Sequence, residues 1–251
     1  MKKLKILITN DDGIEGQGFK ILKQRLEWDD HDIICLVPDR DCSAISHGMT
    51  IEKEMKFSDC GNNVYTLAGK PADCIISALR GNLFNGWIPD VVLSGINRGA
   101  NLGTDVIYSG TVAAARQAVL YGIPGVALSL ESYDGTWNYK PLADFAAKNL
   151  EKLMRLCACS SGSMASFVNV NAASTGSYPL AQMTRLSHRE YNDKAVLNKE
   201  TSFVKISGGV LETFALSDSD FAVSKSGKIS VSTIHANPIL AETVEEIDFI
   251  L

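Results

Sequence analysis

The N-terminal half of the chain alternates short apolar runs with segments of helical periodicity. Runs rich in aliphatic and β-branched residues predict strands at 4–9, 33–37, 90–94, 126–130 and 167–170. Apolar residues at helical spacing predict helices at 18–26, from Pro71 onward, at 111–121 and at 142–156. Such alternation predicts an α/β fold with a mostly parallel sheet and helices on both faces.

Two stretches depart from this alternation. Between Thr50 and Leu67, the segments 51–55 and 64–67 predict a short antiparallel excursion. From 187 to 232, short alternating runs are broken by glycine pairs and Ser-Gly turns, which predicts β-hairpins. We therefore expect an α/β core over 1–186 and a β-rich appendage with a C-terminal arm over 187–251.

Composition narrows the class of protein. The chain has 251 residues, of which 45% are hydrophobic and 21% charged, as is typical of a globular protein. Its formal net charge of −5 argues against binding along a nucleic-acid backbone, which requires a basic face. The first apolar run ends at Asn10, too early for a secretory signal, and no stretch is long enough to cross a membrane. We therefore expect a cytoplasmic protein.

Polar segments directly follow three of the predicted strands, at 10–13, 38–43 and 95–99. In an open parallel sheet, ligands bind outside the carboxyl ends of the strands. The three segments are therefore expected to meet at one rim of the sheet and to form the functional site.

The first of these segments contains two adjacent carboxylates, Asp11 and Asp12. Asn-Asp-Asp-Gly is also good turn chemistry, and from the residues alone a turn and a metal site are equally acceptable. Two carboxylates crowded after a buried strand are costly unless a cation neutralises them, which favours a metal. Ser43 and Asn97 would add neutral oxygens, and an all-oxygen set suits Mg²⁺ or Mn²⁺ rather than zinc.

A loop rich in Gly and Asn, 95–105, leads to Ser109-Gly110-Thr111 at the start of a predicted helix. Unpaired N–H groups, two hydroxyls and the positive end of the helix dipole would make a phosphate cradle there. A plain helix N-cap is the alternative. Asn10 and Gly95, which belong to the neighbouring polar segments, complete the predicted phosphate-binding set.

One histidine lies in a predicted rim loop, His47. A lone histidine is more often a hydrogen-bonded structural group than a catalyst. The sharper hypothesis is a general acid that protonates the leaving alkoxide.

Taken together, these motifs resemble the survival protein E (SurE) family of nucleotidases. The matching stretches are 8–13, 38–43, 46–47, 69–74, 89–97, 101–105, 108–112 and 115–116, with weaker similarity at 168–171. The resemblance implies a Rossmann-like core, one Mg²⁺ or Mn²⁺ per subunit and hydrolysis of 5′- and 3′-nucleoside monophosphates, with short polyphosphate as a further substrate of some members. It also implies homodimers or homotetramers that exchange C-terminal segments.

Carried over residue by residue, the resemblance places the metal ligands at Asp11, Asp12, Ser43 and Asn97, with Asp11, Asp12 and Asn97 as catalytic residues. The chain departs from the family pattern nearby, with Asp41 in place of Asn and Ala44 in place of Gly. These departures leave open a non-hydrolytic, metal-dependent nucleotide-sensing module. A phosphatase that uses Asp11 as a covalent nucleophile is a separate alternative, but that class favours two carboxylates separated by one residue, whereas Asp11 and Asp12 are adjacent.

Overall fold

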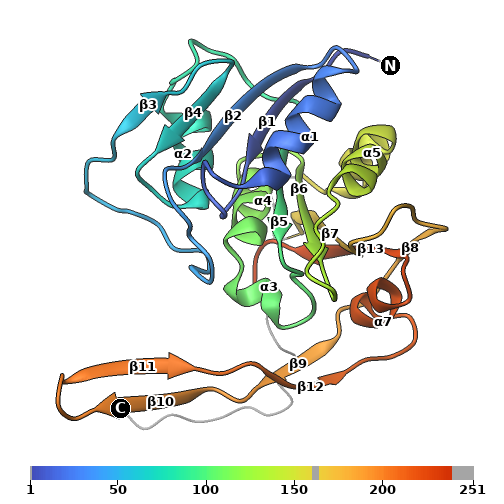
Figure 1. Cartoon of the computed structure of the whole chain (residues 1–251). Helices are drawn as coiled ribbons and strands as arrows, with labels where there is room; N and C mark the ends of the chain where they lie inside the picture. The colour runs from blue at the N-terminus through green and yellow to red at the C-terminus, as the bar shows by residue number, and fades with distance from the viewer. Residues whose placement is uncertain (1, 160–163, 239–251) are drawn as a thin grey trace, which may run out of the picture.

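A computed structural model describes residues 2–159 and 164–238, and its centre is a nine-stranded sheet (Figure 1). The order across the sheet is β3-β4-β2-β1-β5-β6-β7-β13-β8. The strands are β1 (Lys5–Thr9), β2 (Asp32–Pro38), β3 (Phe57–Asp59), β4 (Val64–Leu67), β5 (Val91–Arg98), β6 (Gly125–Glu131), β7 (Ser166–Ala173), β8 (Ala181–Met183) and β13 (Ile229–His235). The run from β4 to β7 is parallel throughout, whereas β3 and β13 are antiparallel to their neighbours β4 and β7.

Helices cover both faces of this sheet, which confirms the predicted α/β class. The helices are α1 (Gln17–Glu27), α2 (Pro71–Arg80), α3 (Asp105–Tyr108), α4 (Gly110–Leu120), α5 (Lys140–Lys148), α6 (Leu150–Leu156) and α7 (Asp220–Lys225). Helices α1, α5 and α6 pack on one face, and α2 and α4 on the other.

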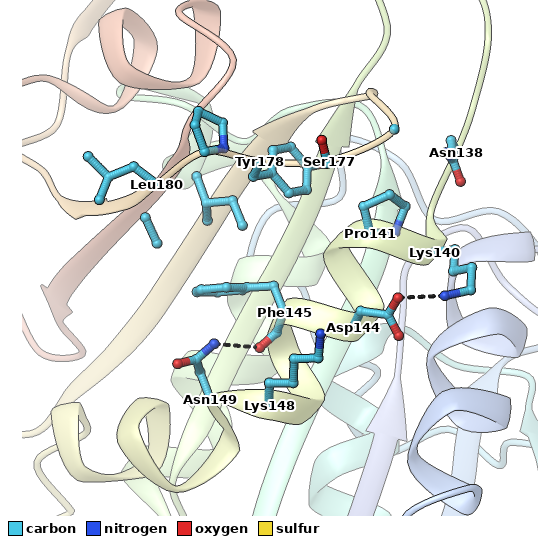
Figure 2. A pocket seen from close by; sticks show the side chains of 14 residues that line it. Asn138, Lys140, Pro141, Asp144, Phe145, Lys148, Asn149, Ser177, Tyr178 and Leu180 are labelled. Carbon is cyan, nitrogen blue, oxygen red and sulfur yellow. Dashed lines mark hydrogen bonds and ion pairs between the residues drawn. The ribbon is translucent and has the colours of Figure 1, made fainter.

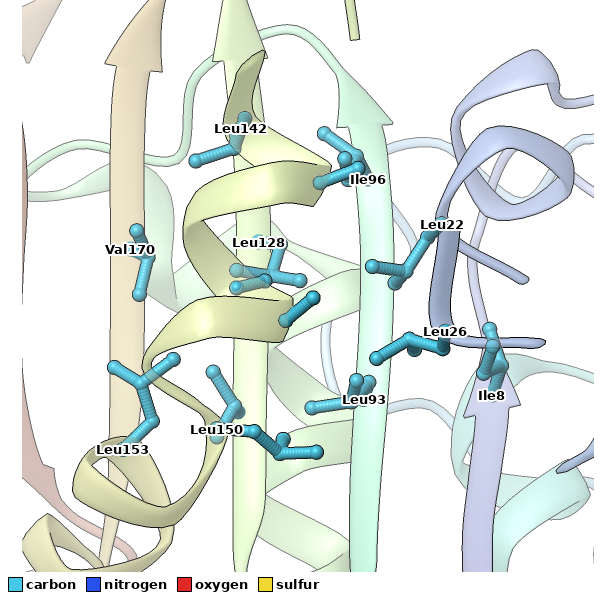
Figure 3. Close-up of a cluster of buried hydrophobic side chains, with 14 of the residues drawn as sticks. Ile8, Leu22, Leu26, Leu93, Ile96, Leu128, Leu142, Leu150, Leu153 and Val170 are labelled. Carbon is cyan, nitrogen blue, oxygen red and sulfur yellow. The ribbon is translucent and has the colours of Figure 1, made fainter. Parts of the chain in front are cut away.

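The larger core lies under α1, α5 and α6 (Figure 3). Leu22 and Leu26 of α1 belong to the same buried cluster as Ile8 and Leu93 of the sheet. Successive strand residues point to opposite faces, so Leu7 joins the second cluster, beneath α2 and α4. Burial on both faces explains why these strands read as continuous apolar runs.

Two predicted elements differ from the structure. The segment 51–55 is not a strand; the antiparallel partner of β4 is β3, a few residues later. The helix expected over 142–156 is two helices, because the chain turns at Asn149, whose side-chain amide donates to the carbonyl of Phe145 at 3.0 Å. Periodicity survives such a break, and the sequence pattern therefore did not show it.

The predicted hairpins are present as two small antiparallel sheets. They are β9 (His188–Tyr191) with β12 (Val210–Phe214), and β10 (Lys194–Asn198) with β11 (Phe203–Ser207). All residues of β10 and β11 are exposed, and Figure 1 shows this hairpin projecting away from the sheet. After the hairpins, α7 and β13 return to the central sheet.

The division of the chain at residue 186 stays a prediction. The predicted C-terminal arm falls largely on 239–251, outside the described residues. Across 2–159 and 164–238, no helix combines the length and apolar character needed to span a bilayer.

Candidate active site

The order of the sheet places a topological switch between β1 and β5, because the chain proceeds from β1 to β2 on one side and later to β5 on the other. Ligand sites in open α/β sheets form at such a switch, beyond the carboxyl ends of the strands. Asp11 and Asp12 follow β1, Asn97 lies near the end of β5, and Ser43 follows β2. The sheet therefore brings the three polar segments to one rim, as the sequence predicted.

Backbone contacts hold these segments together. The N–H of Cys42 donates to the carbonyl of Asp11 at 2.7 Å. Gly13 has a φ of +73°, and a Cβ there would lie 2.5 Å from the carbonyl carbon and oxygen of Arg40. Only glycine fits this contact and this backbone angle, so Gly13 is what lets the second segment pack against the Asp11-Asp12 turn.

Asp11 is buried, with 4% of its surface exposed. Both of its carboxylate oxygens accept hydrogen bonds from Thr111, Oδ2 from the backbone N–H at 3.1 Å and Oδ1 from the hydroxyl. Gly110 allows the start of α4 to approach, since a Cβ there would lie 2.9 Å from the Asp11 Cβ. Burial raises the pKa of Asp11 to about 6; the hydrogen bonds from Thr111 oppose this shift, and the charge of Asp12 adds to it.

Asp12 accepts from the backbone N–H of Arg98 at 3.1 Å. Burial raises its pKa, the Arg98 hydrogen bond opposes the shift, and the nearby carboxylate of Asp41 raises the pKa further. Asp41 in turn accepts from the N–H and hydroxyl of Ser43 at 2.8 and 2.6 Å. Three carboxylates thus crowd one edge of the rim.

A cleft of about 490 Å³ opens over this rim. It is lined by Asp11, Ser43, Ala44, Asn97, Arg98, Gly99, Ala100, Asn101, Asp105, Tyr108, Ser109, Glu131, Arg189, Tyr191 and Asp193. We call it the Asp11 cleft. A second cleft, of about 650 Å³, contains Asp12, Asp41 and Trp137 and shares Ser43 and Arg98 with the first; we call it the Asp12 cleft. Of the four predicted metal ligands, Asp11 and Asn97 line the Asp11 cleft, Asp12 lines the Asp12 cleft, and Ser43 lines both.

The donor set fits a hard divalent cation. The predicted set is made of two carboxylates, a hydroxyl and an amide, and oxygen ligands of this kind suit Mg²⁺. Within the described residues, no group of three or more His, Cys, Asp or Glu that could hold a metal ion is found. The hydroxyl of Ser43 and the side-chain amide of Asn97 act as donors, to Asp41 and to the Gly99 carbonyl, and keep oxygen lone pairs for a cation. Burial is the main cause of the raised pKa values of Asp11 and Asp12, and the charges of Asp12 and Asp41 add to it; a cation at this site would favour the charged form of both carboxylates.

Several predicted residues lie elsewhere. Asn10 is buried, and its amide donates to the Gly13 carbonyl at 2.8 Å, which shapes the turn. A Cβ at Gly95 would lie 2.2 Å from the Leu128 carbonyl, so this glycine permits strand packing and does not line either cleft. The backbone N–H and the hydroxyl of Thr111 both donate hydrogen bonds to Asp11. Of the phosphate-binding set, only Ser109 lines the Asp11 cleft.

His47 is also outside both clefts. Its Nε2 lies 2.9 Å from Oε1 of Gln117 on α4. Burial lowers its pKa, and the bond to Gln117 opposes that shift. This geometry fits the hydrogen-bonded structural histidine, and the general-acid role stays a prediction.

Two residues that the sequence did not point to line the Asp11 cleft from β9. Tyr191 donates its hydroxyl to Oδ1 of Asp105, and Nη1 of Arg189 donates to Oδ2 of the same carboxylate. The backbone N–H of Arg189 also bonds to the Thr104 hydroxyl at 2.9 Å. These partners lie more than 80 positions apart in the chain, and no local motif marks them.

A separate groove of about 640 Å³ lies between α5 and the segment 176–181 (Figure 2). Phe145, Tyr178 and Leu180 line it, and Lys140 at its edge is paired with Asp144 at 2.6 Å. It contains none of the predicted site residues, and the candidate active site is therefore the pair of clefts at the rim.

The model of the survival protein SurE family matches residues 6–193, three quarters of the chain. The chain belongs to the SurE family. A 5′-nucleotidase SurE of Treponema pallidum is 40% identical over 189 residues, covering 73% of this chain and 98% of the relative. A 5′-nucleotidase SurE of Geobacter metallireducens is 33% identical over 237 residues, covering 92% and 91%.

The fold agrees with this membership. The crystal structure of SurE protein from Aquifex aeolicus superposes with a TM-score of 0.76 at 26% identity, covering 93% of this chain and 94% of that one. The resemblance drawn from the motifs at the rim is thereby confirmed, and the SurE match extends through β9, which supplies Arg189 and Tyr191.

Proposed function

We propose that this SurE-family chain is a divalent-metal-dependent 5′-nucleotidase that hydrolyses nucleoside monophosphates to nucleoside and phosphate. The observation that carries the proposal is the pair Asp11 and Asp12 at the switch point: Asp11 is buried, Asp12 is half-buried, and burial raises the pKa of each. Relatives named 5′-nucleotidase SurE support the substrate class.

Asp11, Asp12, Ser43 and Asn97 would hold Mg²⁺ or Mn²⁺, one ion per subunit. A divalent cation supplies Lewis acidity to a phosphoryl oxygen and acidifies a water molecule. Thr111 orients the Asp11 carboxylate through two hydrogen bonds, and Arg98 orients Asp12 through its backbone N–H. The protein thus fixes both carboxylates before substrate arrives, which lowers the reorganisation needed during the reaction.

The start of α4 offers hydrogen-bond donors that would bind the phosphate. Ser109 accepts from the N–H of Val112 at 3.1 Å, which leaves its hydroxyl hydrogen free to donate into the cleft. The N–H of Gly110 belongs to the first helical turn, whose N–H groups have no intrahelical acceptor. Together with the positive end of the helix dipole, these donors would hold equatorial oxygens as charge develops on them.

Phosphate release from AMP tests the proposal. We expect release with Mn²⁺ or Mg²⁺, and loss of release when a chelator is present. A panel of 5′-AMP, 3′-AMP and short polyphosphate tests the wider substrate range that the resemblance implies. Binding of AMP with Mn²⁺ but without any release would instead identify the non-hydrolytic sensing module.

Covalent catalysis by Asp11 is the remaining rival. Both carboxylate oxygens of Asp11 accept hydrogen bonds from Thr111, an arrangement that restrains them and weakens their nucleophilicity. We therefore expect no phosphoenzyme to accumulate on rapid acid quench with ³²P-labelled AMP. Trapped label on Asp11 would establish the covalent route.

Assembly into dimers or tetramers and a cytoplasmic location stay predictions from the sequence. Sedimentation analysis of the full chain tests the first. Fractionation of cells that express it tests the second.

A further inference from the structure

Two tyrosines, Tyr108 and Tyr191, line the Asp11 cleft together with Asn97 and Ser109. We propose that Tyr108 and Tyr191 form the nucleobase subsite, with the base stacking on Tyr108. The inference rests on the proposed function, because it assumes that the phosphate lies at Asn97 and Ser109. It assigns to β9, a strand of the hairpin region, a part in recognising the substrate.

Tyr108 is the last residue of α3 and directly precedes Ser109. Its side chain is 49% exposed although it lines the cleft, so ring surface is open to a ligand. The ring of Tyr191 meets it edge to face, with centroids 6.0 Å apart and planes at 83°. Two aromatic rings beside a phosphate site offer a stacking surface, and stacking suits every base because each has a π face.

The second tyrosine is held rigidly. Its hydroxyl donates to Asp105, which also accepts from Arg189 and from the N–H of Leu102 at 3.2 Å. Burial raises the pKa of the Tyr191 hydroxyl, and so does the bond to Asp105, so the phenol remains a neutral donor. Because Asp105 begins α3, the short helix that ends at Tyr108, this network ties β9 to that helix and restrains the Tyr191 ring before substrate binds.

The Asp12 cleft offers a competing aromatic residue, Trp137. The Arg98 guanidinium already lies over its ring at 5.1 Å, and Tyr139, only 5% exposed, stacks on it at 6.2 Å and 19°. Trp137 is therefore engaged by other side chains. In addition, Asn97 and Ser109 line only the Asp11 cleft, so a base attached to a phosphate at those residues reaches Tyr108 first.

Tyr108→Ala tests the subsite, with Tyr108→Phe as the variant that keeps the ring. Two substrates are compared: AMP, which has a base, and ribose 5-phosphate, which does not. We expect Tyr108→Ala to lower kcat/KM for AMP roughly tenfold, mainly through KM, and to leave ribose 5-phosphate unchanged. Tyr108→Phe should retain wild-type values on both. Trp28→Ala, which removes an exposed ring outside both rim clefts, is the control.

Binding of adenosine, measured by calorimetry, separates this inference from the nucleotidase proposal because it requires neither phosphate nor turnover. We expect Tyr108→Ala to weaken adenosine binding about tenfold and Trp137→Ala to leave it unchanged. Wild-type adenosine binding that is insensitive to Tyr108→Ala, or an AMP-selective loss in Trp137→Ala, would overturn the subsite. Absence of phosphate release from every substrate would overturn the proposed function and leave the adenosine result to decide the subsite.

Discussion

The rim of the sheet and the β10–β11 hairpin differ in how far their side chains are buried. At the rim, Asp11 is a buried charge whose oxygens are both hydrogen-bonded, next to strands buried on two faces. In the hairpin, every residue is exposed, including Leu197 and Phe203. The comparison shows that a polar group whose burial is unfavourable is nevertheless buried at the candidate active site. No residue of this hairpin belongs to the three buried hydrophobic clusters that the described residues form.

The strand β9 lies between these extremes. It belongs to the same hairpin region, yet Arg189 and Tyr191 bond to Asp105 at the cleft. Proximity in sequence to an exposed hairpin therefore does not decide whether a residue belongs to the site.

The largest effect is expected from Asp11→Asn, which keeps the shape of the side chain and removes its charge. We expect kcat for AMP to fall roughly 10³-fold or more, because a lost metal ligand removes several kcal/mol of transition-state stabilisation. Glu200→Gln, at the exposed turn between β10 and β11, is the control that also removes one negative charge, and it should leave kcat for AMP unchanged. Equal activities of the two variants would contradict the division between rim and hairpin.

Two leucine truncations compare the core and the hairpin directly. Leu22 is fully buried and Leu197 is 53% exposed. Leu22→Ala should lower the free energy of unfolding by about 3 kcal/mol through lost burial and a residual cavity. Leu197→Ala should change it by less than about 0.5 kcal/mol. Urea denaturation of both variants measures the difference. Similar losses in the free energy of unfolding would show that Leu197 makes packing contacts that stabilise the protein.

The buried charge at the rim predicts an unusual pH dependence of stability without metal. The pKa of Asp11 is raised from 3.8 to about 6, so between these values the folded state binds a proton that the unfolded state has released. This contribution is fully present below pH 3.8 and is lost as pH rises through about 6. As the pH rises over that range, the free energy of unfolding of the metal-free protein should fall by about 3 kcal/mol relative to that of the Asp11→Asn variant.

Chelator-treated samples unfolded in urea at several pH values measure this difference. Added Mn²⁺ should reduce the loss at neutral pH, because a cation favours the charged carboxylate. A difference between the two proteins that does not vary with pH would show that Asp11 titrates normally.

The smallest effect is expected from Asp41→Asn, which removes one of the three carboxylates at the rim. The charge of Asp41 raises the pKa of Asp12, and the same negative potential attracts a cation. We expect the Kd for Mn²⁺ to rise only about two- to fivefold, because Asp41 is exposed and solvent weakens the effect of its charge. Asn can still accept from Ser43, so the loop should persist. Tighter Mn²⁺ binding by the variant would contradict this account.

The parallel sheet and the meeting of the three polar segments could be predicted because both follow from local patterns. Apolar runs mark strands buried on two faces, and the topology rule then places Asp11 and Asn97 together. The break at Asn149 was missed because hydrophobic periodicity continues across it.

Other features depended on contacts that no local pattern encodes. The link from Asp105 to Arg189 and Tyr191 spans more than 80 residues. Thr111 and Gly95 matched expected phosphate-binding chemistry, but the structure uses one to orient Asp11 and the other to let strands approach. At these positions the sequence shows which residue types are present, but it does not show which groups they contact.

The account depends most on a cation shared by the first two carboxylates and by Ser43 and Asn97. An anomalous difference map from crystals grown in Mn²⁺ tests it directly. We predict one strong peak per subunit where the two clefts meet, about 2.2 Å from oxygens of Asp11, Asp12, Ser43 and Asn97. No peak between these side chains, or an ion held only by residues outside this set, would contradict the account.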